Sequence, residues 1–108
     1  MELLFKHGRL SIASSGDMPG ALVIGILSWE GDEVFHHIIP SESRIFLTEL
    51  LGTDIFGEYT YGPIRVIKHP TGWLEFQITT WTDPEPVAVV PEHISGGVLD
   101  AVRLWTSN

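Results

Sequence analysis

The sequence contains no cysteine, few cations and no long apolar segment. Without cysteine the chain has no disulfide, no thiolate nucleophile and no cysteine-based zinc site. It has six lysines and arginines against fourteen aspartates and glutamates, which gives a formal net charge of −8. This balance weighs against broad nucleic-acid binding, which depends on neutralising phosphates with cations, and it leaves room for a basic partner.

Segments that would carry the chain to or across a membrane are also missing from the sequence. The densest apolar run, Ala21 to Leu27, is far too short to span a bilayer. The residues after Met1 lack the long apolar stretch of a signal peptide. We therefore expect a cytoplasmic protein with no membrane association. Its 108 residues are enough for one domain, which we expect to span residues 1–108.

Familiar catalytic and ligand-binding motifs are absent as well. The chain has no G-x-G-x-x-G or P-loop pattern for phosphates and no H-E-x-x-H spacing for a metal. His36 and His37 are adjacent, so on a strand they point to opposite faces and cannot hold one metal together. Residues 30–33 include three carboxylates but lack the spacing of a calcium loop. We expect no catalytic residue, no metal and no cofactor.

The sequence does contain an internal repeat, which is visible in the spacing of glycine, tryptophan and proline residues. Each half reads as a strand, a loop, a second strand ending near a tryptophan, an acidic turn, a third strand, a proline and a helix. The offsets between matched residues are nearly constant. They are 54 for Gly8 and Gly62, 52 for Gly20 and Gly72, 52 for Trp29 and Trp81, and 51 for Pro40 and Pro91.

This repeat predicts an α+β fold made of two tandem β-β-β-α units related by a pseudo-two-fold axis. The units cover about residues 2–52 and 57–106, and their antiparallel sheets are packed by two helices. A long first strand that bends at Gly8 or Gly62 would count as two strands. The segment 83–86 contains two prolines and predicts a turn.

The two central strands differ in their outer faces. Residues 73–80 alternate apolar and polar side chains, which is typical of a strand with one face in the core and one in water. In residues 21–28 the inner positions are apolar too, but so are Val23 and Leu27 on the other face. An apolar outer face requires a cover, which is another layer, a dimer mate or a partner protein.

The first helix is predicted between Ser41, as its N-cap, and Gly52, as its C-terminal stop. Its apolar face would be broad and would include Ile45 and Phe46. The second helix is predicted from an apolar pattern over residues 94–105. Its two consecutive glycines, at 96 and 97, each weaken a helix by about 1 kcal/mol relative to alanine, so we expect an irregular first turn.

Four of the six basic residues fall on the first strands of the two units, beside aromatic residues. Cations interleaved with rings are typical of platforms for single-stranded nucleic acid. The order strand, proline, helix over residues 34–51 and 87–104 resembles the repeats of the PC4, PUR and whirly single-stranded-DNA-binding folds. Those families are basic on their binding sheet, whereas this chain is acidic. The platform that this interpretation implies consists of Lys6, Arg9, Tyr59, Tyr61, Arg65, Lys68 and Trp73.

We favour instead a non-catalytic interaction protein, such as a small regulator, inhibitor or assembly factor, that is itself oligomeric. It would bind a protein partner, or a second copy, through an apolar sheet face and two acidic tips that steer a basic surface. The candidate residues are Val23, Leu27, Trp29, Glu30, Asp32, Glu33, Trp81, Asp83 and Glu85. A third interpretation is an enzyme whose site lies in a cleft between the units, lined by His37 or His69 and a carboxylate.

Overall fold

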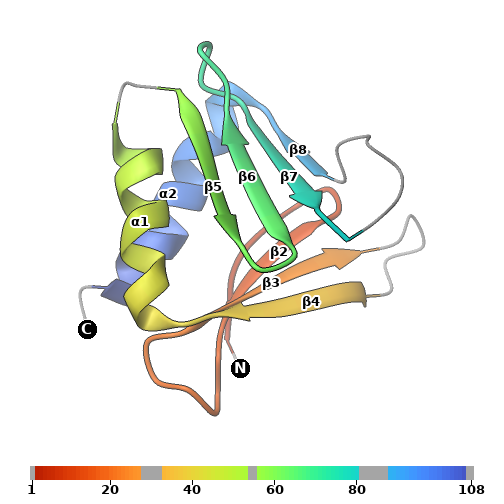
Figure 1. Ribbon diagram of the computed structural model, residues 1–108, viewed down its shortest axis with the longest axis vertical. Helices are drawn as coiled ribbons and strands as arrows, with labels where there is room; N and C mark the ends of the chain where they lie inside the picture. The colour runs from red at the N-terminus through yellow and green to blue at the C-terminus, as the bar shows by residue number, and fades with distance from the viewer. Residues whose placement is uncertain (1, 28–32, 54–55, 81–87, 107–108) are drawn as a thin grey trace.

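The computed structural model describes residues 2–27, 33–53, 56–80 and 88–106 and shows an α+β fold of two units (Figure 1). Each unit contains four strands followed by one helix. The first unit consists of β1 (Leu3–His7), β2 (Leu10–Ser14), β3 (Leu22–Leu27), β4 (Glu33–Ile39) and α1 (Ser41–Gly52). The second consists of β5 (Gly57–Tyr61), β6 (Ile64–Lys68), β7 (Leu74–Ile78), β8 (Ala88–Val90) and α2 (Glu92–Thr106).

Each unit has one strand more than the three we counted from the sequence, because its first strand is a tight hairpin. Gly8 and Gly62 adopt φ values of 57° and 54°, while Arg9 and Pro63, which follow them, do not have positive φ. A two-residue turn with positive φ only at its first position is type II′, which favours glycine there and matches the twist of the flanking strands. The chain therefore reverses at these glycines instead of bending.

The repeat predicted from spacing is confirmed in the backbone. Two other matched anchors, Gly20 and Gly72, are the remaining positive-φ glycines among the described residues. The matched hydrogen bonds recur too. Leu27 N donates to Arg9 O at 2.7 Å in the first unit, and Thr79 N donates to Pro63 O at 2.7 Å in the second. Equivalent glycines and equivalent backbone bonds show that the same unit occurs twice.

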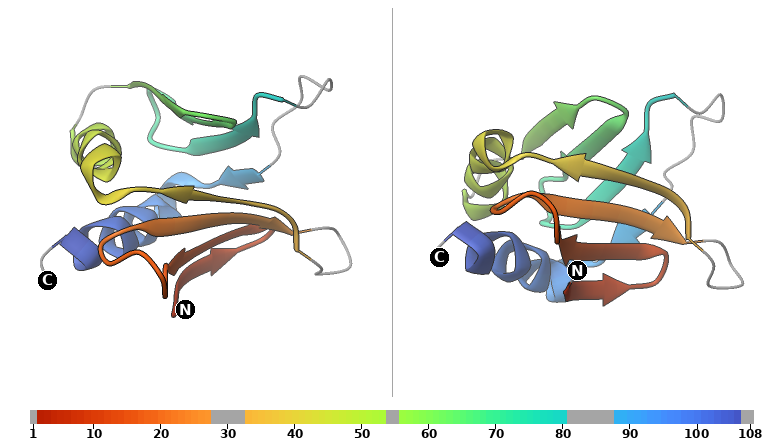
Figure 2. Two further views of the ribbon diagram at one scale, coloured as in Figure 1. Left: turned by 60° about the horizontal axis from the view of Figure 1, so that its bottom comes forward. Right: turned by 90° about the horizontal axis from the view of Figure 1, so that it is seen from below.

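Two antiparallel four-stranded sheets, ordered β1-β2-β3-β4 and β5-β6-β7-β8, enclose the core with their inner faces (Figure 2). The inner positions of the central strands are buried as the alternation predicted. Burial of each such side chain contributes about 1.5–3 kcal/mol. These positions are Leu22, Ile24 and Ile26 on β3, and Leu74, Phe76 and Ile78 on β7.

The two helices pack side by side (Figure 1). Each helix contacts the sheet of the other unit more extensively than the sheet of its own unit. Helix α1 packs against β5, where a Cβ on Gly57 would lie 3.4 Å from Leu50 Cδ1. Helix α2 packs against β1 and β2, where Phe5 lies against Gly97. The units are therefore intertwined, and the core is shared between them.

The ends of α1 differ by a residue from those that the sequence predicts, and α2 begins two residues earlier than its predicted start, at Glu92. Helix α1 starts at Ser41 with Pro40 as its N-cap and without a side-chain capping bond, and it includes Gly52. Helix α2 continues through Gly96 and Gly97 in place of the irregular turn we expected, because the missing side chain lets Phe5 approach. No helix in the described part of the chain is long and apolar enough to cross a membrane.

Candidate interaction surfaces

The outer face of the first sheet carries the apolar positions that the sequence pattern indicated. Val23 and Leu27 are both half-buried on the side of β3 opposite the core. Strand register places two rows across this face. One row consists of Leu3, Ala13, Val23 and Ile38, and the other of Lys6, Ser11, Gly25 and His36. In the view from below, the first sheet lies in front of the second (Figure 2). We call the row Leu3, Ala13, Val23 and Ile38 the apolar row.

The equivalent face of the second sheet has a different composition. Register aligns Thr60, Arg65 and Gln77 in one row of polar side chains. The neighbouring row mixes carboxylates with apolar residues and consists of Glu58, Ile67, Glu75 and Val89. The two units therefore share a backbone but present different outer faces, as the alternation in their central strands predicts.

The two acidic turns lie outside the residues that the structure describes. This applies to Trp29, Glu30, Asp32, Trp81, Asp83 and Glu85, and to the side chain of Glu33 at the start of β4. Their role as steering tips therefore stays a prediction.

Three residues of the expected nucleic-acid platform point into the molecule. Tyr59 is buried, with 8% of its surface exposed, and burial together with Tyr61 raises its pKa to about 12. Tyr61 is half-buried beside His37, with ring centroids 5.9 Å apart. The Lys68 ammonium donates to the carbonyls of Leu50 and Leu51 at 3.3 Å, and also to Thr53 O. Lys68 thus binds the carbonyl end of α1.

The other four platform residues lie on separate surfaces. Lys6 is exposed on the outer face of the first sheet, whereas Arg65 is half-buried on the outer face of the second. Arg9 lies in the β1–β2 turn and donates from Nε to Leu27 O at 2.7 Å. Trp73 stacks on His69 with ring centroids 3.6 Å apart. The structure does not gather the seven residues on one face.

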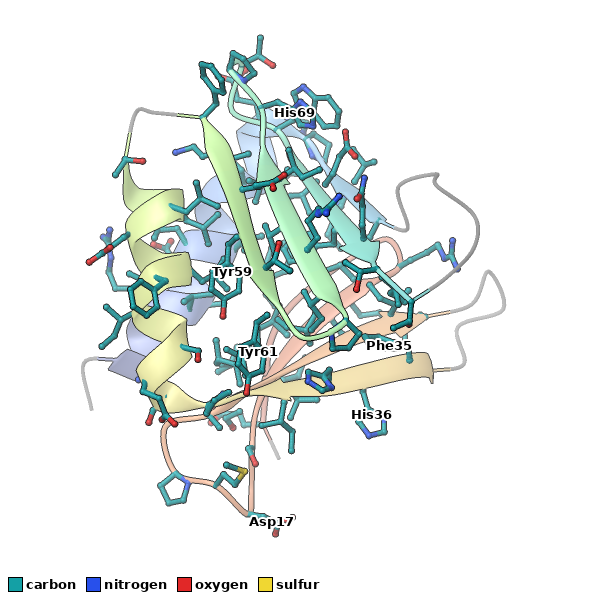
Figure 3. All side chains as sticks on the ribbon, viewed as in Figure 1. Asp17, Phe35, His36, Tyr59, Tyr61 and His69 are labelled. Atoms are coloured by element: carbon teal, nitrogen blue, oxygen red, sulfur yellow. The ribbon has the colours of Figure 1, made fainter. Side chains whose placement is uncertain are left out.

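The adjacent histidines of β4 lie on opposite faces of the strand. Figure 3 shows Phe35 and His36 on opposite sides of β4, and His37 follows on the inner side, where a Cβ on Gly62 would lie 3.2 Å from its Nε2. Within the described ranges no group of three histidines, aspartates or glutamates is arranged to hold a metal ion.

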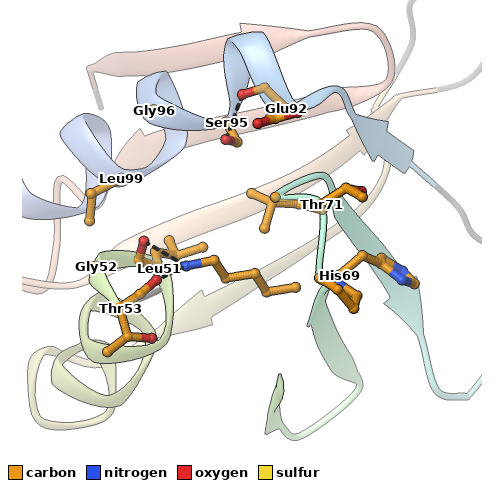
Figure 4. A pocket seen from close by; sticks show the side chains of 13 residues that line it. Leu51, Gly52, Thr53, His69, Thr71, Glu92, Ser95, Gly96 and Leu99 are labelled. Carbon is orange, nitrogen blue, oxygen red and sulfur yellow. Dashed lines mark hydrogen bonds between the residues drawn. The ribbon is translucent and has the colours of Figure 1, made fainter. Parts of the chain in front are cut away.

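A cleft of about 440 Å³ lies where the ends of α1 and α2 meet the β6–β7 turn (Figure 4). Its lining combines apolar residues, such as Leu51 and Leu99, with Lys68, Thr71 and Glu92. Lys68 crosses this space to the carbonyls of α1, so its ammonium is already bound. Of the hydroxyl groups in the lining, Ser95 Oγ donates to Glu92 O at 2.8 Å.

His69 also lines the cleft. Its imidazole turns away toward β7 (Figure 4), and its Nε2 lies 2.6 Å from Glu75 Oε1. Gln77 Nε2 donates to Glu75 Oε2 at 3.1 Å, which holds the carboxylate in place. The histidine and carboxylate that the enzyme interpretation required therefore meet on the outer face of the second sheet.

Helix α1 carries a surface that the sequence pattern did not predict. We expected Ile45 and Phe46 on the packed face, but they are 53% and 63% exposed. Arg44 is buried instead, with 6% of its surface exposed, and burial lowers its pKa. Its Nε and Nη1 atoms have no hydrogen-bond partner. Leu47 and Leu51 are buried as the apolar pattern predicts, and only the packing of α1 reveals that Ile45 and Phe46 lie outside the packed face.

Comparisons with known proteins give no information about these surfaces. No family model matches the chain, and neither a curated protein nor a solved structure matches it. No activity, partner or site residue is therefore transferred to it from another protein.

Proposed function

We propose that the protein is a non-catalytic interaction module that binds a protein surface through the outer face of its first sheet. The observation that carries this proposal is the apolar row across that face, in which Leu3 is 59% exposed and Val23 and Ile38 are half-buried. Helix α2 packs against β1 and β2, and its contact at Gly97 is with Phe5, which does not belong to this row. A row of this kind is stabilised when a second surface removes it from water, at about 25 cal/mol per Å² of apolar area.

The shape of the face suits a flat partner. Gly25, which lies between Ser11 and His36 in the neighbouring row, adds no side chain from β3 and is itself buried. A sheet or helix can approach such a surface and pack against Val23 and Ile38 on one side of it. The net charge of −8 favours encounter with basic proteins and opposes non-specific association between copies.

The single-stranded nucleic-acid interpretation has less support. A platform needs cations and rings on one accessible surface. Here Tyr59 is buried and the Lys68 ammonium is held by α1, while Lys6 and Arg65 lie on different sheets. The enzyme interpretation has less support for a similar reason, because His69 faces away from the cleft.

Matched substitutions on the two sheets test the proposal. Val23→Thr keeps the side-chain shape and replaces a methyl with a hydroxyl, whereas Ile38→Thr keeps the β-branch, shortens the side chain by one carbon and also adds a hydroxyl to the apolar row. Ile67→Thr is the control at a half-buried position on the outer face of the second sheet. Each purified variant is immobilised and exposed to cell extract, the captured proteins are quantified, and self-association is followed in parallel by sedimentation velocity.

We expect the two first-sheet variants to lose about tenfold of the binding seen with the wild type, because a hydroxyl desolvated in an apolar contact costs about 1–3 kcal/mol. The Ile67→Thr variant should retain the binding. Equal effects at all three positions, or a wild type that captures nothing and stays monomeric at high concentration, would contradict the proposal.

A further inference from the structure

Helix α1 presents a stripe of four residues to solvent. Glu42, Ile45, Phe46 and Glu49 are all exposed, and their spacing of i, i+3, i+4 and i+7 places them on one side of the helix. We call them the outer stripe of α1. It holds two large apolar side chains in the middle and a carboxylate at each end. The helix contains no lysine and only one arginine, Arg44, which is buried.

Helix α1 packs Leu47 and Leu51 into the core and leaves two other large apolar side chains exposed. Ile45 and Phe46 leave more than half of their surfaces in water, while the neighbouring Arg44 guanidinium is taken out of it. Two of its nitrogens find no acceptor. Buried polar nitrogens without acceptors destabilise a fold, whereas burying isoleucine or phenylalanine stabilises it. A surface outside the monomer that covered Ile45 and Phe46 would remove their apolar area from water and stabilise this arrangement.

The charges of the stripe distinguish between its occupants. A second copy packed stripe to stripe would bring Glu42 and Glu49 near the same carboxylates of its mate, and two chains of net charge −8 would repel each other. A partner with an apolar face bordered by lysine or arginine would instead pair with both ends of the stripe.

We infer that the outer stripe of α1 is a docking site for a basic amphipathic segment of a partner protein. Ile45 and Phe46 supply the apolar centre, and Glu42 and Glu49 pair with cations at its rim. This site is on a different element from the apolar row of the first sheet. It does not depend on the proposed function of that row, and variants of one surface leave the other intact.

Fluorescence anisotropy with the full-length protein tests the inference. The probe is a labelled amphipathic peptide of about 15 residues, long enough to form a helix, with leucines on one face and lysines along its borders. A second peptide replaces every lysine with glutamate. Both are titrated with the wild type, with Phe46→Ser, with the double charge reversal Glu42→Lys and Glu49→Lys, and with Val23→Ser as the control on the first sheet.

We expect the lysine peptide to bind at least about tenfold more tightly than the glutamate peptide, and its binding to weaken as salt screens the carboxylates. Phe46→Ser should lower the affinity about tenfold, as loss of an aromatic anchor does. The charge reversal should also weaken binding and remove most of its salt dependence. Val23→Ser should change the affinity by less than about twofold.

Three results would overturn the inference. The first is equal binding of both peptides, and the second is an effect of Val23→Ser as large as that of Phe46→Ser. The third is concentration-dependent dimerisation of the wild type, seen by sedimentation velocity and abolished by Phe46→Ser, which would make a second copy the occupant. Because Phe46 is exposed, circular dichroism is expected to show an unchanged fold for its serine variant.

Discussion

The ring of Phe5 lies so close to Gly97 that a Cβ atom on the glycine would be 2.8 Å from Phe5 Cε2. Phe5 belongs to β1 of the first unit and Gly97 to α2 of the second. This contact is one of the points at which the two units interlock. It also gives a structural reason for glycine at position 97, because a side chain there would collide with the ring.

Substituting the two neighbouring glycines with alanine separates this contact from helix propensity. Both Gly96→Ala and Gly97→Ala gain up to about 1 kcal/mol of intrinsic helix stability. A Cβ at position 96 meets nothing within 4 Å, so that variant should be stabilised, whereas at position 97 it collides with Phe5. Overpacking typically costs about 1–3 kcal/mol, so Gly97→Ala should be destabilised on balance. Urea denaturation measures both, and equal stabilisation of the two variants would show that Phe5 does not pack there.

Replacing Arg44 with methionine should stabilise the protein. The side chain keeps a similar length and flexibility, and the buried guanidinium, two of whose nitrogens lack partners, is removed. Apolar replacement of a poorly compensated buried charge is often stabilising by about 1–4 kcal/mol. The midpoint of urea denaturation should rise for Arg44→Met. A fall of similar size would mean that an acceptor holds the guanidinium in the folded protein.

Tyr59 gives the protein a specific response to alkaline pH. Its pKa is raised to about 12 by burial, and to a lesser extent by Tyr61, against about 10 in the unfolded chain. Below about pH 10 the phenol is protonated in both states and contributes no pH dependence. Between about pH 10 and 12 only the unfolded state releases the proton, so stability falls as pH rises.

The variant Tyr59→Phe isolates this effect from the titration of other groups. The Tyr59 hydroxyl has no hydrogen-bond partner, so removing it should leave the stability near neutral pH unchanged or slightly higher. Denaturation at about pH 9 and about pH 11 should show a smaller loss of stability for Tyr59→Phe than for the wild type. An identical loss in both proteins would assign the alkaline transition to other residues.

We expect Lys68 to contribute to the stability of the fold and not to the binding of a partner. Its ammonium donates to carbonyl oxygens at the C-terminal end of α1, where a cation also interacts favourably with the helix dipole. Lys68→Met should therefore destabilise the fold by about 1–2 kcal/mol. Lys6→Met removes an exposed lysine from the first sheet and should stay within about 0.5 kcal/mol of the wild type. Similar thermal midpoints for the two variants would argue against the contact with α1.

Much of the fold could be predicted from the sequence because the repeat is marked by glycines, which determine where the backbone turns. Gly8, Gly62, Gly20 and Gly72 were matched by spacing, and all four adopt positive φ. Alternation on β3 and β7 predicted the buried faces. Hydropathy patterns state which face of a helix or strand is apolar but not which sheet covers it, so the exchange of α1 and α2 between units could not be predicted.

The surfaces were harder to predict, for reasons visible at single residues. Lys68 and Tyr59 lie at inward positions of their strands, and a count of basic and aromatic residues does not register orientation. Arg44 and Phe46 reverse the usual preference of charge for water and of rings for the core. Such local conflicts between sequence and packing are expected where a surface serves binding. The apolar row was found because Val23 breaks the alternation seen in the other unit.

The most direct test of the proposed function is photo-crosslinking in cells that express the protein natively. A photoreactive phenylalanine analogue is introduced at Val23 in one variant and at Thr60 in another, since Thr60 is exposed on the outer face of the second sheet. Our account predicts a discrete crosslinked species from position 23, either to a partner protein or to a second copy, and none from position 60. No crosslink from position 23, or the same products from both positions, would contradict the assignment of the first sheet as the binding face.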